Sequence, residues 1–505
     1  MKRKLVRKMF ASLLAASMVI GMAGCGDQPG NQDGGGTSQS NQPTSDQSTP
    51  NQSTPDSSTG SSTPETPAAT EAPAEDLGGY TIRTDANGNK IDLGGIHVTV
   101  RDWTTDPNAV NEDTSAYAEA RKQYQDWVQE TYNFTIEQKA ISTWESAPED
   151  FSNYVTEGGD DNYYLFYLYK GPALQSAMKN GLMYDLSTLD CLDLSEGKWH
   201  DGVSEMFSAD GKVYGMRNNE GIGGRGVYFN KRILKDAGID PEDLYKWQEA
   251  GEWTWEKFEE VCAKVQKDVD NDGVADIYGM ATRNTIWYEV ITHTNNGDFI
   301  GKDANGTLVN SLESSATMEA LNWALDIWDK YDAHLSYPED AAWDYFLTAY
   351  KEGKGCFYPG ELWRAKDLMD SMEDELGFVC FPKGPQADDY VNPVADDPFV
   401  IPACYDADKA WKIAFAFDVW TEPVPEFEDY AAWKVDGYNT FDDTESVDST
   451  VTLLMDRPKP TYNALVSDID LAEDIFYKLS KENTPAQIAE AVKSQWQAKL
   501  DAVNK

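Results

Sequence analysis

The chain contains few residues of the kinds that build metal centres and redox sites. Its 505 residues include only four histidines and six cysteines. No two cysteines form a C-x-x-C pair, so a zinc or redox site is not expected. The G-x-S-x-G, H-E-x-x-H and P-loop motifs are also absent. These absences leave little material for a histidine-based metal site or catalytic cluster.

Basic residues are scarce as well. The chain has 42 Lys and Arg against 87 Asp and Glu, a formal net charge of −45. An acidic chain of this kind is not expected to bind nucleic acid or an anionic membrane surface. The apolar run at 10–22, of about 13 residues, is too short to span a bilayer, which takes about 20. No other stretch is long and apolar enough to span a bilayer.

The first 25 residues are typical of a targeting segment. Five basic residues precede the apolar run, and Met22-Ala23-Gly24-Cys25 ends it. This pattern predicts a signal peptide over 1–24. The tetrapeptide resembles the lipobox of bacterial lipoproteins, so we expect Cys25 to carry lipid, palmitate included, and to anchor the protein at the outer face of a bacterial cell membrane. The alternative is an ordinary secretory signal with a chance cysteine.

Two further segments follow the anchor. Residues 25–76 are rich in Ser, Thr, Gln and Pro and have almost nothing to bury, which predicts a disordered tether. Residues 77–505 are too many for one ordinary core and predict two lobes. Within them, a strand signal at 96–103, a helix signal at 116–131 and a strand from 134 alternate as in α/β folds.

An aspartate-rich segment gives the sharpest chemical signal. Its candidate calcium ligands, at positions 1, 3, 5, 7 and 9 of a loop, are Asp268, Asp270, Asp272, the carbonyl of Val274, and Asp276. Gly273 falls where a calcium loop turns sharply. Position 12, where an EF-hand loop has its closing Glu, is Gly279. A structural Ca²⁺ site is therefore one interpretation, and a solvated Asp-Gly turn without metal is the other.

Three segments in a row carry a family resemblance. They are YFNKRILKDAGI (228–239), WTWEKFEEVCAKV (253–265) and DVDNDGVADIYGM (268–280). In this order and spacing they resemble the extracellular solute-binding proteins of bacterial ABC importers, family 1, the sugar-binding group. The resemblance spans most of 96–505. It implies a monomeric protein that captures a carbohydrate, an oligosaccharide above all, and delivers it to the transmembrane permease of an ABC transporter.

The resemblance also implies a fold. It is an α/β, two-lobed periplasmic-binding-protein-like fold of type II, with the ligand cleft between the lobes. The first lobe is expected over 94–215 and 394–450, and the second over 220–392 and 455–505. In such a fold, ligands bind at the carboxyl ends of the strands, and closure of the lobes traps them.

Candidate ligand-binding residues follow from strand ends and from the family's pattern. Aromatic rings stack on the apolar faces of sugars, and carboxylates accept hydrogen bonds from hydroxyls. The resemblance implies stacking roles for Tyr169, Trp287 and Trp363, and a polar contact for Asp106. Trp103 ends the first strand, and Asp397 is a candidate hydroxyl acceptor in the second crossover. For every aromatic the alternative is core packing, and for Asp397 it is a carboxylate in a turn.

Two other classes of function stay open. One is a surface lipoprotein that grips polysaccharide without transport. The other is a carbohydrate-active enzyme that uses two carboxylates, but in a chain with 87 acidic residues such pairs decide nothing. We expect a binding protein and no catalytic residues.

Overall fold

The computed structural model describes residues 80–105, 116–169, 172–218, 223–304, 306–394, 397–427, 432–466 and 469–504. All of them belong to one compact unit, Leu77–Lys505, and the chain's other unit is Met1–Asp76. The predicted signal peptide and tether, Cys25, and Asp106 therefore lie outside the described residues.

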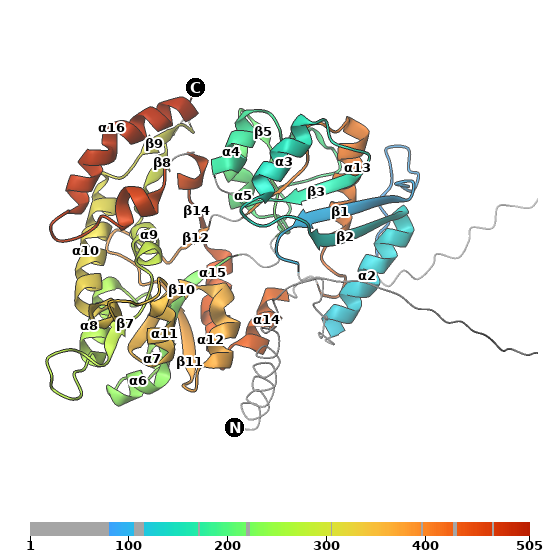
Figure 1. Ribbon diagram of the computed structural model, residues 1–505. Helices are drawn as coiled ribbons and strands as arrows, with labels where there is room; N and C mark the ends of the chain where they lie inside the picture. Colours follow the sequence, from blue (N-terminus) through green and yellow to red (C-terminus); the bar gives the residue numbers. More distant parts are fainter. Residues whose placement is uncertain are drawn as a thin grey trace, which may run out of the picture. The chain divides into compact units, whose positions relative to one another are not determined.

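The first lobe is built on a four-stranded sheet with the order β13-β3-β1-β2 (Figure 1). Its strands are β1 (Ile96–Asp102), β2 (Phe134–Ala140), β3 (Tyr163–Tyr167) and β13 (Phe399–Val400). β1 lies between β2 and β3 and runs parallel to both, and β13 pairs antiparallel with β3. The carboxyl ends of β1, β2 and β3 therefore meet at one edge of the sheet, which is where ligands bind in α/β folds.

Helices cover both faces of this sheet. They are α2 (Ala116–Tyr132) and α13 (Ala407–Trp420) on one face, and α3 (Ala147–Thr156), α4 (Pro172–Lys179) and α5 (Asp201–Met206) on the other. Neighbouring residues of β3 show the two faces: Leu165 packs with Val128 of α2, while Phe166 packs with Phe151 of α3. Successive side chains of a strand point to opposite faces, so both sides of the sheet are core. The short elements η1 (Leu186–Thr188), β4 (Ser208–Ala209) and β5 (Lys212–Val213) complete this part.

The second lobe contains the sheet β11-β6-β10-β7. Its strands are β6 (Arg225–Asn230), β7 (Tyr278–Met280), β10 (Gly355–Glu361) and β11 (Leu376–Cys380). β10 runs parallel to β7 and antiparallel to β6, and β11 is also antiparallel to β6. In β6, all residues after Arg225 are buried, as a strand covered on both faces requires.

Around this sheet lie α6 (Lys231–Asp236), α7 (Glu242–Glu249), α8 (Trp255–Val265), α9 (Asn284–Thr294), α10 (Ser315–Tyr331), η2 (Ala333–Ser336), α11 (Tyr345–Lys351), η3 (Leu362–Arg364) and α12 (Ala365–Ser371). A hairpin formed by β8 (Ile300–Lys302) and β9 (Leu308–Asn310) lies between α9 and α10 in the chain. The C-terminal part contains η5 (Asn463–Leu465), η6 (Ala472–Phe476) and α16 (Pro485–Val503). Local signals define the helix ends: Asn230 accepts hydrogen bonds from the first amides of α6, and Gly238 follows it at φ +72°. Thr254 caps α8, because its side chain accepts a hydrogen bond from the backbone amide of Lys257.

Extended segments connect the two lobes. The chain leaves the first lobe after residue 218, returns through β12 (Asn392–Val394) to β13, and leaves again after α13. β14 (Pro458–Pro460) pairs in parallel with β12, so two connecting segments are hydrogen-bonded to each other. A contact between the lobes lies beside them, where Tyr462 donates to Glu205 of α5 at 2.6 Å.

The lobe boundary predicted at residue 450 differs from the observed packing. The elements α14 (Ala432–Thr440), η4 (Ser446–Val451) and α15 (Thr452–Asp456) pack with the second lobe. Phe441 lies 5.5 Å from Phe378 of β11 between ring centroids, and Thr450 donates to the carbonyl of Phe378 at 2.7 Å. The apolar face of this segment is thus buried on the second sheet, which makes it part of that lobe.

Candidate ligand-binding site

Aromatic side chains gather at the carboxyl ends of the first lobe's strands. Trp103 follows β1, is half-buried and stacks on Tyr167 at the end of β3, with ring centroids 4.6 Å apart and planes 9° from parallel. Tyr169, two residues beyond β3, is 37% exposed. Its ring meets that of Trp144 edge-on at 5.3 Å, and Trp144 is 51% exposed. Trp144 and Tyr169 therefore present aromatic surface to solvent.

Trp144 was not predicted from the sequence. It lies four residues after the end of β2, in the turn that precedes α3. The rule that selected Trp103 and Tyr169, an aromatic residue just after a strand, applies to it equally. The signal was therefore present in the sequence.

A buried carboxylate shapes the turn after β1. Asp102 is 1% exposed and accepts hydrogen bonds from the hydroxyls of Thr104 and Thr105 and from the amide of Gln138, at 2.5–3.2 Å. These bonds satisfy the charged group, as burial of a carboxylate requires. Asp102 therefore acts as a structural anchor, and the predicted polar contact, Asp106, lies beyond the described end of this turn.

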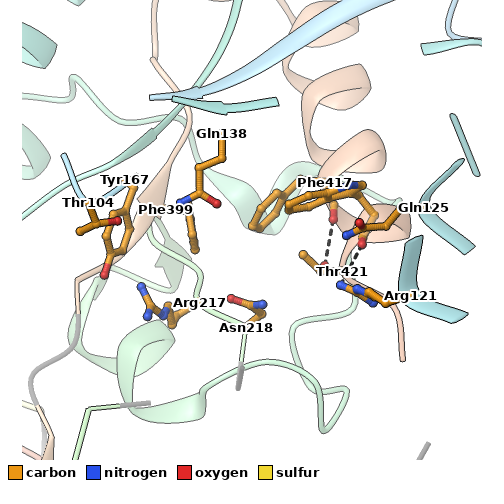
Figure 2. A pocket seen from close by; sticks show the side chains of 11 residues that line it. Thr104, Arg121, Gln125, Gln138, Tyr167, Arg217, Asn218, Phe399, Phe417 and Thr421 are labelled. Carbon is orange, nitrogen blue, oxygen red and sulfur yellow. Dashed lines mark hydrogen bonds between the residues drawn. The ribbon is translucent and has the colours of Figure 1, made fainter. Parts of the chain in front are cut away.

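A pocket of about 260 Å³ lies in the first lobe (Figure 2). Its lining is Thr104, Arg121, Gln125, Gln138, Tyr167, Arg217, Asn218, Phe399, Phe417, Trp420 and Thr421. The guanidinium carbon of Arg217 lies 4.8 Å from the ring centroid of Tyr167 and 5.6 Å from that of Phe399. Arg217 also donates to the carbonyl of Asp397 at 3.4 Å. The predicted residue Asp397 thus lies beside this pocket, and its carbonyl makes that contact.

At the carboxyl ends of β10 and β7 in the second lobe, Trp363 lies next to a charged cluster. Trp363 is 68% exposed, and the guanidinium carbon of Arg364 lies 4.2 Å from its ring centroid. Glu361 accepts from Arg283 at 3.0 Å and lies 3.4 Å from Nε of Arg364. Burial raises the pKa of the nearby Tyr358 phenol, and the charge of Glu361 adds to this, so Tyr358 stays neutral. The guanidinium of Arg364 covers one face of the Trp363 indole and helps to fix the orientation of the ring.

Trp363 also lines a second pocket, of about 520 Å³. Its other lining residues include Trp433, Phe441, Lys366, Asp436, Gly223 and Gly224. The first pocket contains Arg217 and Asn218, the last described residues before the chain crosses to the second lobe. Residues 217–218 thus contribute to the first pocket and residues 223–224 to the second.

The structure contradicts the prediction for Trp287. This residue lies on α9, is 0% exposed and donates from its indole nitrogen to the carbonyl of Ala324 at 2.9 Å. Its ring packs against Phe258 and Trp323, with centroids 5.4 and 5.8 Å away. A ring with no exposed face cannot stack on a sugar, so Trp287 is a core residue. Trp103, Tyr169 and Trp363 remain predicted ligand contacts.

The aspartate-rich loop brings together three of its four carboxylates. Oxygens of Asp268, Asp270 and Asp276 lie within 4.8 Å of one another. Asp272 turns instead to the amide of Val274, at 2.8 Å. Gly273 has φ +94°, the left-handed conformation that a sharp turn of this kind needs. The donor set is hard oxygen throughout and fits Ca²⁺, although Gly279 gives no closing carboxylate.

Among the described residues, no helix has the length and apolar character needed to cross a membrane. The two sheets, the connecting segments paired by β12 and β14, and aromatic and charged groups at strand ends define a two-lobed α/β binding protein. A sequence model of the family described as bacterial extracellular solute-binding protein matches residues 129–441, more than half of the chain. The chain belongs to this family, which confirms the resemblance seen in the sequence.

Three similar proteins extend the comparison. The arabinooligosaccharide-binding protein of Halalkalibacterium halodurans is 23% identical over 36% of this chain and 37% of its own. The polygalacturonan/rhamnogalacturonan-binding protein YtcQ of Bacillus subtilis is 20% identical over 44% of each chain. The chain thus spans less than half the length of these two relatives.

The third is the solved structure of the cyclic alpha-maltosyl-1,6-maltose binding protein from Arthrobacter globiformis. It superposes with a TM-score of 0.54 at 16% identity, over 81% of this chain and 100% of that one. At this identity the likeness concerns the fold, and it confirms the predicted two-lobed type II architecture.

Proposed function

We propose that this protein captures a carbohydrate, an oligosaccharide above all, outside the cell and delivers it to the permease of an ABC transporter. The observation that carries the proposal is the exposed aromatic surface at strand ends in both lobes: Trp144 and Tyr169 in the first, and Trp363 in the second. Rings in such positions stack on the apolar faces of sugars, while neighbouring polar groups bind the hydroxyls. The names of the two curated relatives, which both bind carbohydrate, support this reading.

A ligand that contacts both lobes stabilises their closed arrangement. It does so only through its greater affinity for that arrangement, and closure of this type is common in binding proteins. We expect the captured sugar to be released chemically unchanged, because the family consists of binding proteins.

The proposal includes a location. Residues 1–24 act as a lipoprotein signal peptide, Cys25 carries the lipid, and 25–76 form a tether that holds a monomeric body, 77–505, near the permease. The support is the sequence pattern before Cys25 and the Ser, Thr, Gln and Pro composition of 25–76. A surface lipoprotein that binds polysaccharide without transport is the alternative.

A second proposal concerns calcium. We propose that Asp268, Asp270 and Asp276 hold a structural Ca²⁺, with Asp272 and the carbonyl of Val274 completing the ligand set. The convergence of three carboxylates supports it. Ca²⁺ bound there stiffens the turn between α8 and β7 and takes no part in sugar binding.

Calorimetry with the full chain tests the carbohydrate function. Neutral and acidic oligosaccharides of arabinose, galactose, glucose and galacturonate are titrated separately, and we expect saturable binding of at least one. Uptake of the bound sugar is then measured in cells that lack the protein. Loss of uptake supports delivery to a permease, and unchanged uptake supports binding of polysaccharide without transport. Absence of binding across the panel contradicts the proposal.

A further inference from the structure

A third pocket, of about 600 Å³, has walls from both lobes. The first lobe contributes α4, α5 and the β4–β5 hairpin, and the second contributes the β8–β9 hairpin, η5 and the end of α16. Its lining is Gln175, Met178, Lys179, Met206, Ser208, Ala209, Asp210, Tyr214, Lys302, Gly306, Thr307, Leu308, Leu465, Ala502, Val503 and Asn504. We propose that this pocket binds a short apolar peptide of two or three residues. The proposal goes beyond the carbohydrate function, because none of these residues lines the two pockets described above.

Hydrogen bonds and an ion pair fix the walls of this pocket. Nζ of Lys302 on β8 lies 3.3 Å from Oε1 of Glu205 on α5, and Tyr462 donates to the same oxygen at 2.6 Å. The side chain of Asn504 exchanges two hydrogen bonds with the backbone of Leu308, at 2.8 and 3.0 Å. The first set of contacts joins the two lobes, and the second joins the end of α16 to β9. Interfaces between domains are a common place for small-ligand sites.

Gln175 gives the strongest indication of a ligand. It lines the pocket and is 1% exposed, yet neither its amide nitrogen nor its amide oxygen has a hydrogen-bond partner among the described residues. A buried amide without partners costs stability, so such groups in native proteins are normally paired. A side-chain amide offers a donor and an acceptor next to each other. The N–H and C=O of one residue in an extended peptide point the same way and match this pair, as they match a neighbouring strand in a sheet.

Apolar side chains of the lining suit the side chains of such a peptide. Met178, Met206 and Leu465 come from three different elements and all line the pocket. Methionine is flexible and polarizable, so it adapts to apolar groups of different shape. The volume of about 600 Å³ lies within the roughly 300–1,000 Å³ that is typical of small-ligand pockets. The pocket therefore has room for a ligand the size of a di- or tripeptide.

Charged groups of the lining suit the two ends of the peptide. Lys179 is exposed at the end of α4, and burial lowers the pKa of its ammonium without a charged partner among the described residues to offset this. Asp210 is exposed in the turn between β4 and β5. A free peptide carries a carboxylate at one end and an ammonium at the other. We assign the carboxylate to Lys179 and the ammonium to Asp210.

Calorimetry of the full chain with trileucine tests the proposal. The matched probes are trileucine with an acetylated N-terminus and trileucine with an amidated C-terminus, each of which lacks one charge. We expect trileucine to bind saturably at one site per chain, and each capped peptide to bind about two- to fivefold more weakly, as the loss of an exposed ion pair predicts. Gln175→Met keeps the length of the side chain without its amide, and it weakens binding of trileucine by about tenfold or more, because the peptide group is then left unpaired.

Further variants separate recognition from folding. Unliganded Gln175→Met melts no earlier than the wild type, because the substitution removes an unpaired amide. Lys179→Gln weakens binding of trileucine but leaves the affinity for the amidated peptide unchanged. Lys235→Gln, which removes an exposed charge from α6, is the control and keeps full affinity.

The same titration is repeated in the presence of the oligosaccharide that the protein binds best, and we expect trileucine to bind as before. The proposal fails if trileucine does not bind at millimolar concentration, if folded Gln175→Met binds it as tightly as the wild type does, or if the oligosaccharide displaces it. The carbohydrate function is tested by its own titration without peptide, so it stands or fails independently.

Discussion

The rings of Trp144 and Tyr169 meet edge-on, with centroids 5.3 Å apart and planes at 70°. The two residues follow different strands, β2 and β3, and reach each other only because these strands flank β1 and run parallel to it. Each ring keeps an exposed face, so the pair forms a corner of aromatic surface at the strand ends.

This pair gives the first prediction. Trp144→Ala lowers affinity for the sugar by about 5- to 150-fold, the loss expected when one stacked aromatic ring of about 1–3 kcal/mol is removed. The melting temperature changes little, because half of the ring surface is exposed in the folded state. Calorimetry and melting are measured on the same samples. Tyr477→Ala, which removes an exposed ring outside both pocket linings, is the control and keeps full affinity. Unchanged affinity in Trp144→Ala contradicts the assignment.

A second prediction contrasts two tryptophans that both follow strands of the second sheet. Trp287→Ala leaves a cavity in the core and lowers the free energy of unfolding by about 3–5 kcal/mol. Trp363→Ala removes a ring that is 68% exposed, so it lowers sugar affinity with little loss of stability. Urea unfolding and calorimetry are measured for both. The assignment is wrong if Trp363→Ala destabilises the fold as much as Trp287→Ala does.

The calcium proposal predicts a dependence of stability on the free ion. Binding to the native state alone raises the melting temperature as the concentration of Ca²⁺ rises. A chelator therefore lowers the melting temperature of the wild type, but it has no further effect on Asp270→Ala, which lacks one of the three converging carboxylates. Sugar affinity at saturating Ca²⁺ and in chelator is the same. Equal melting of the wild type in chelator and in Ca²⁺ refutes the site.

Asp298 provides a prediction about pH. Burial by itself raises the pKa of Asp298, but hydrogen bonds and charges from His293 and Lys459 outweigh it and leave the pKa below its ordinary value. A carboxylate with a lowered pKa stabilises the fold above its unfolded pKa, and this contribution is lost as the pH falls through the folded pKa.

Asp298→Asn is therefore expected to cost about 1–3 kcal/mol at pH 7, and the difference from wild type shrinks below about pH 4, near the ordinary pKa of an aspartate. Urea unfolding at pH 7, 5 and 3 measures it. Asp408→Asn, at an exposed i,i+4 pair on α13, is the control and costs less than about 0.5 kcal/mol at every pH. A difference that stays constant down to pH 3 contradicts the assignment to Asp298.

The last prediction concerns the anchor. Cys25→Ser moves the protein from the membrane fraction to the medium, since the predicted lipid is its only expected link to the bilayer. Fractionation and labelling with a fatty-acid analogue measure the change. Cys404→Ser, a change in the folded body, leaves the protein in the membrane fraction. Retention of Cys25→Ser in that fraction, with label still incorporated, counts against lipidation.

The sequence by itself determined the local elements and the class of fold. The alternating apolar pattern at 96–103 and the helical signal at 116–131 correspond to β1 and α2 within a residue or two. Asn230, Gly238 and Thr254 define helix ends through contacts with neighbours in the chain. Signals of this kind depend on a few adjacent residues, so the primary structure contains them completely.

Only the tertiary structure decided which side chains are accessible and which lobe a segment joins. Trp287 and Trp363 both follow strands of the second sheet, yet Trp287 is enclosed by α8 and α10 and Trp363 faces solvent. The boundary predicted at 450 failed in the same way, because Phe441 and Thr450 contact β11, more than sixty residues earlier in the chain. Arg217 meets Tyr167 and Phe399 from two other segments. Whether a side chain is buried or lines a pocket depends on contacts with residues far away in the sequence, and no local sequence pattern determines it.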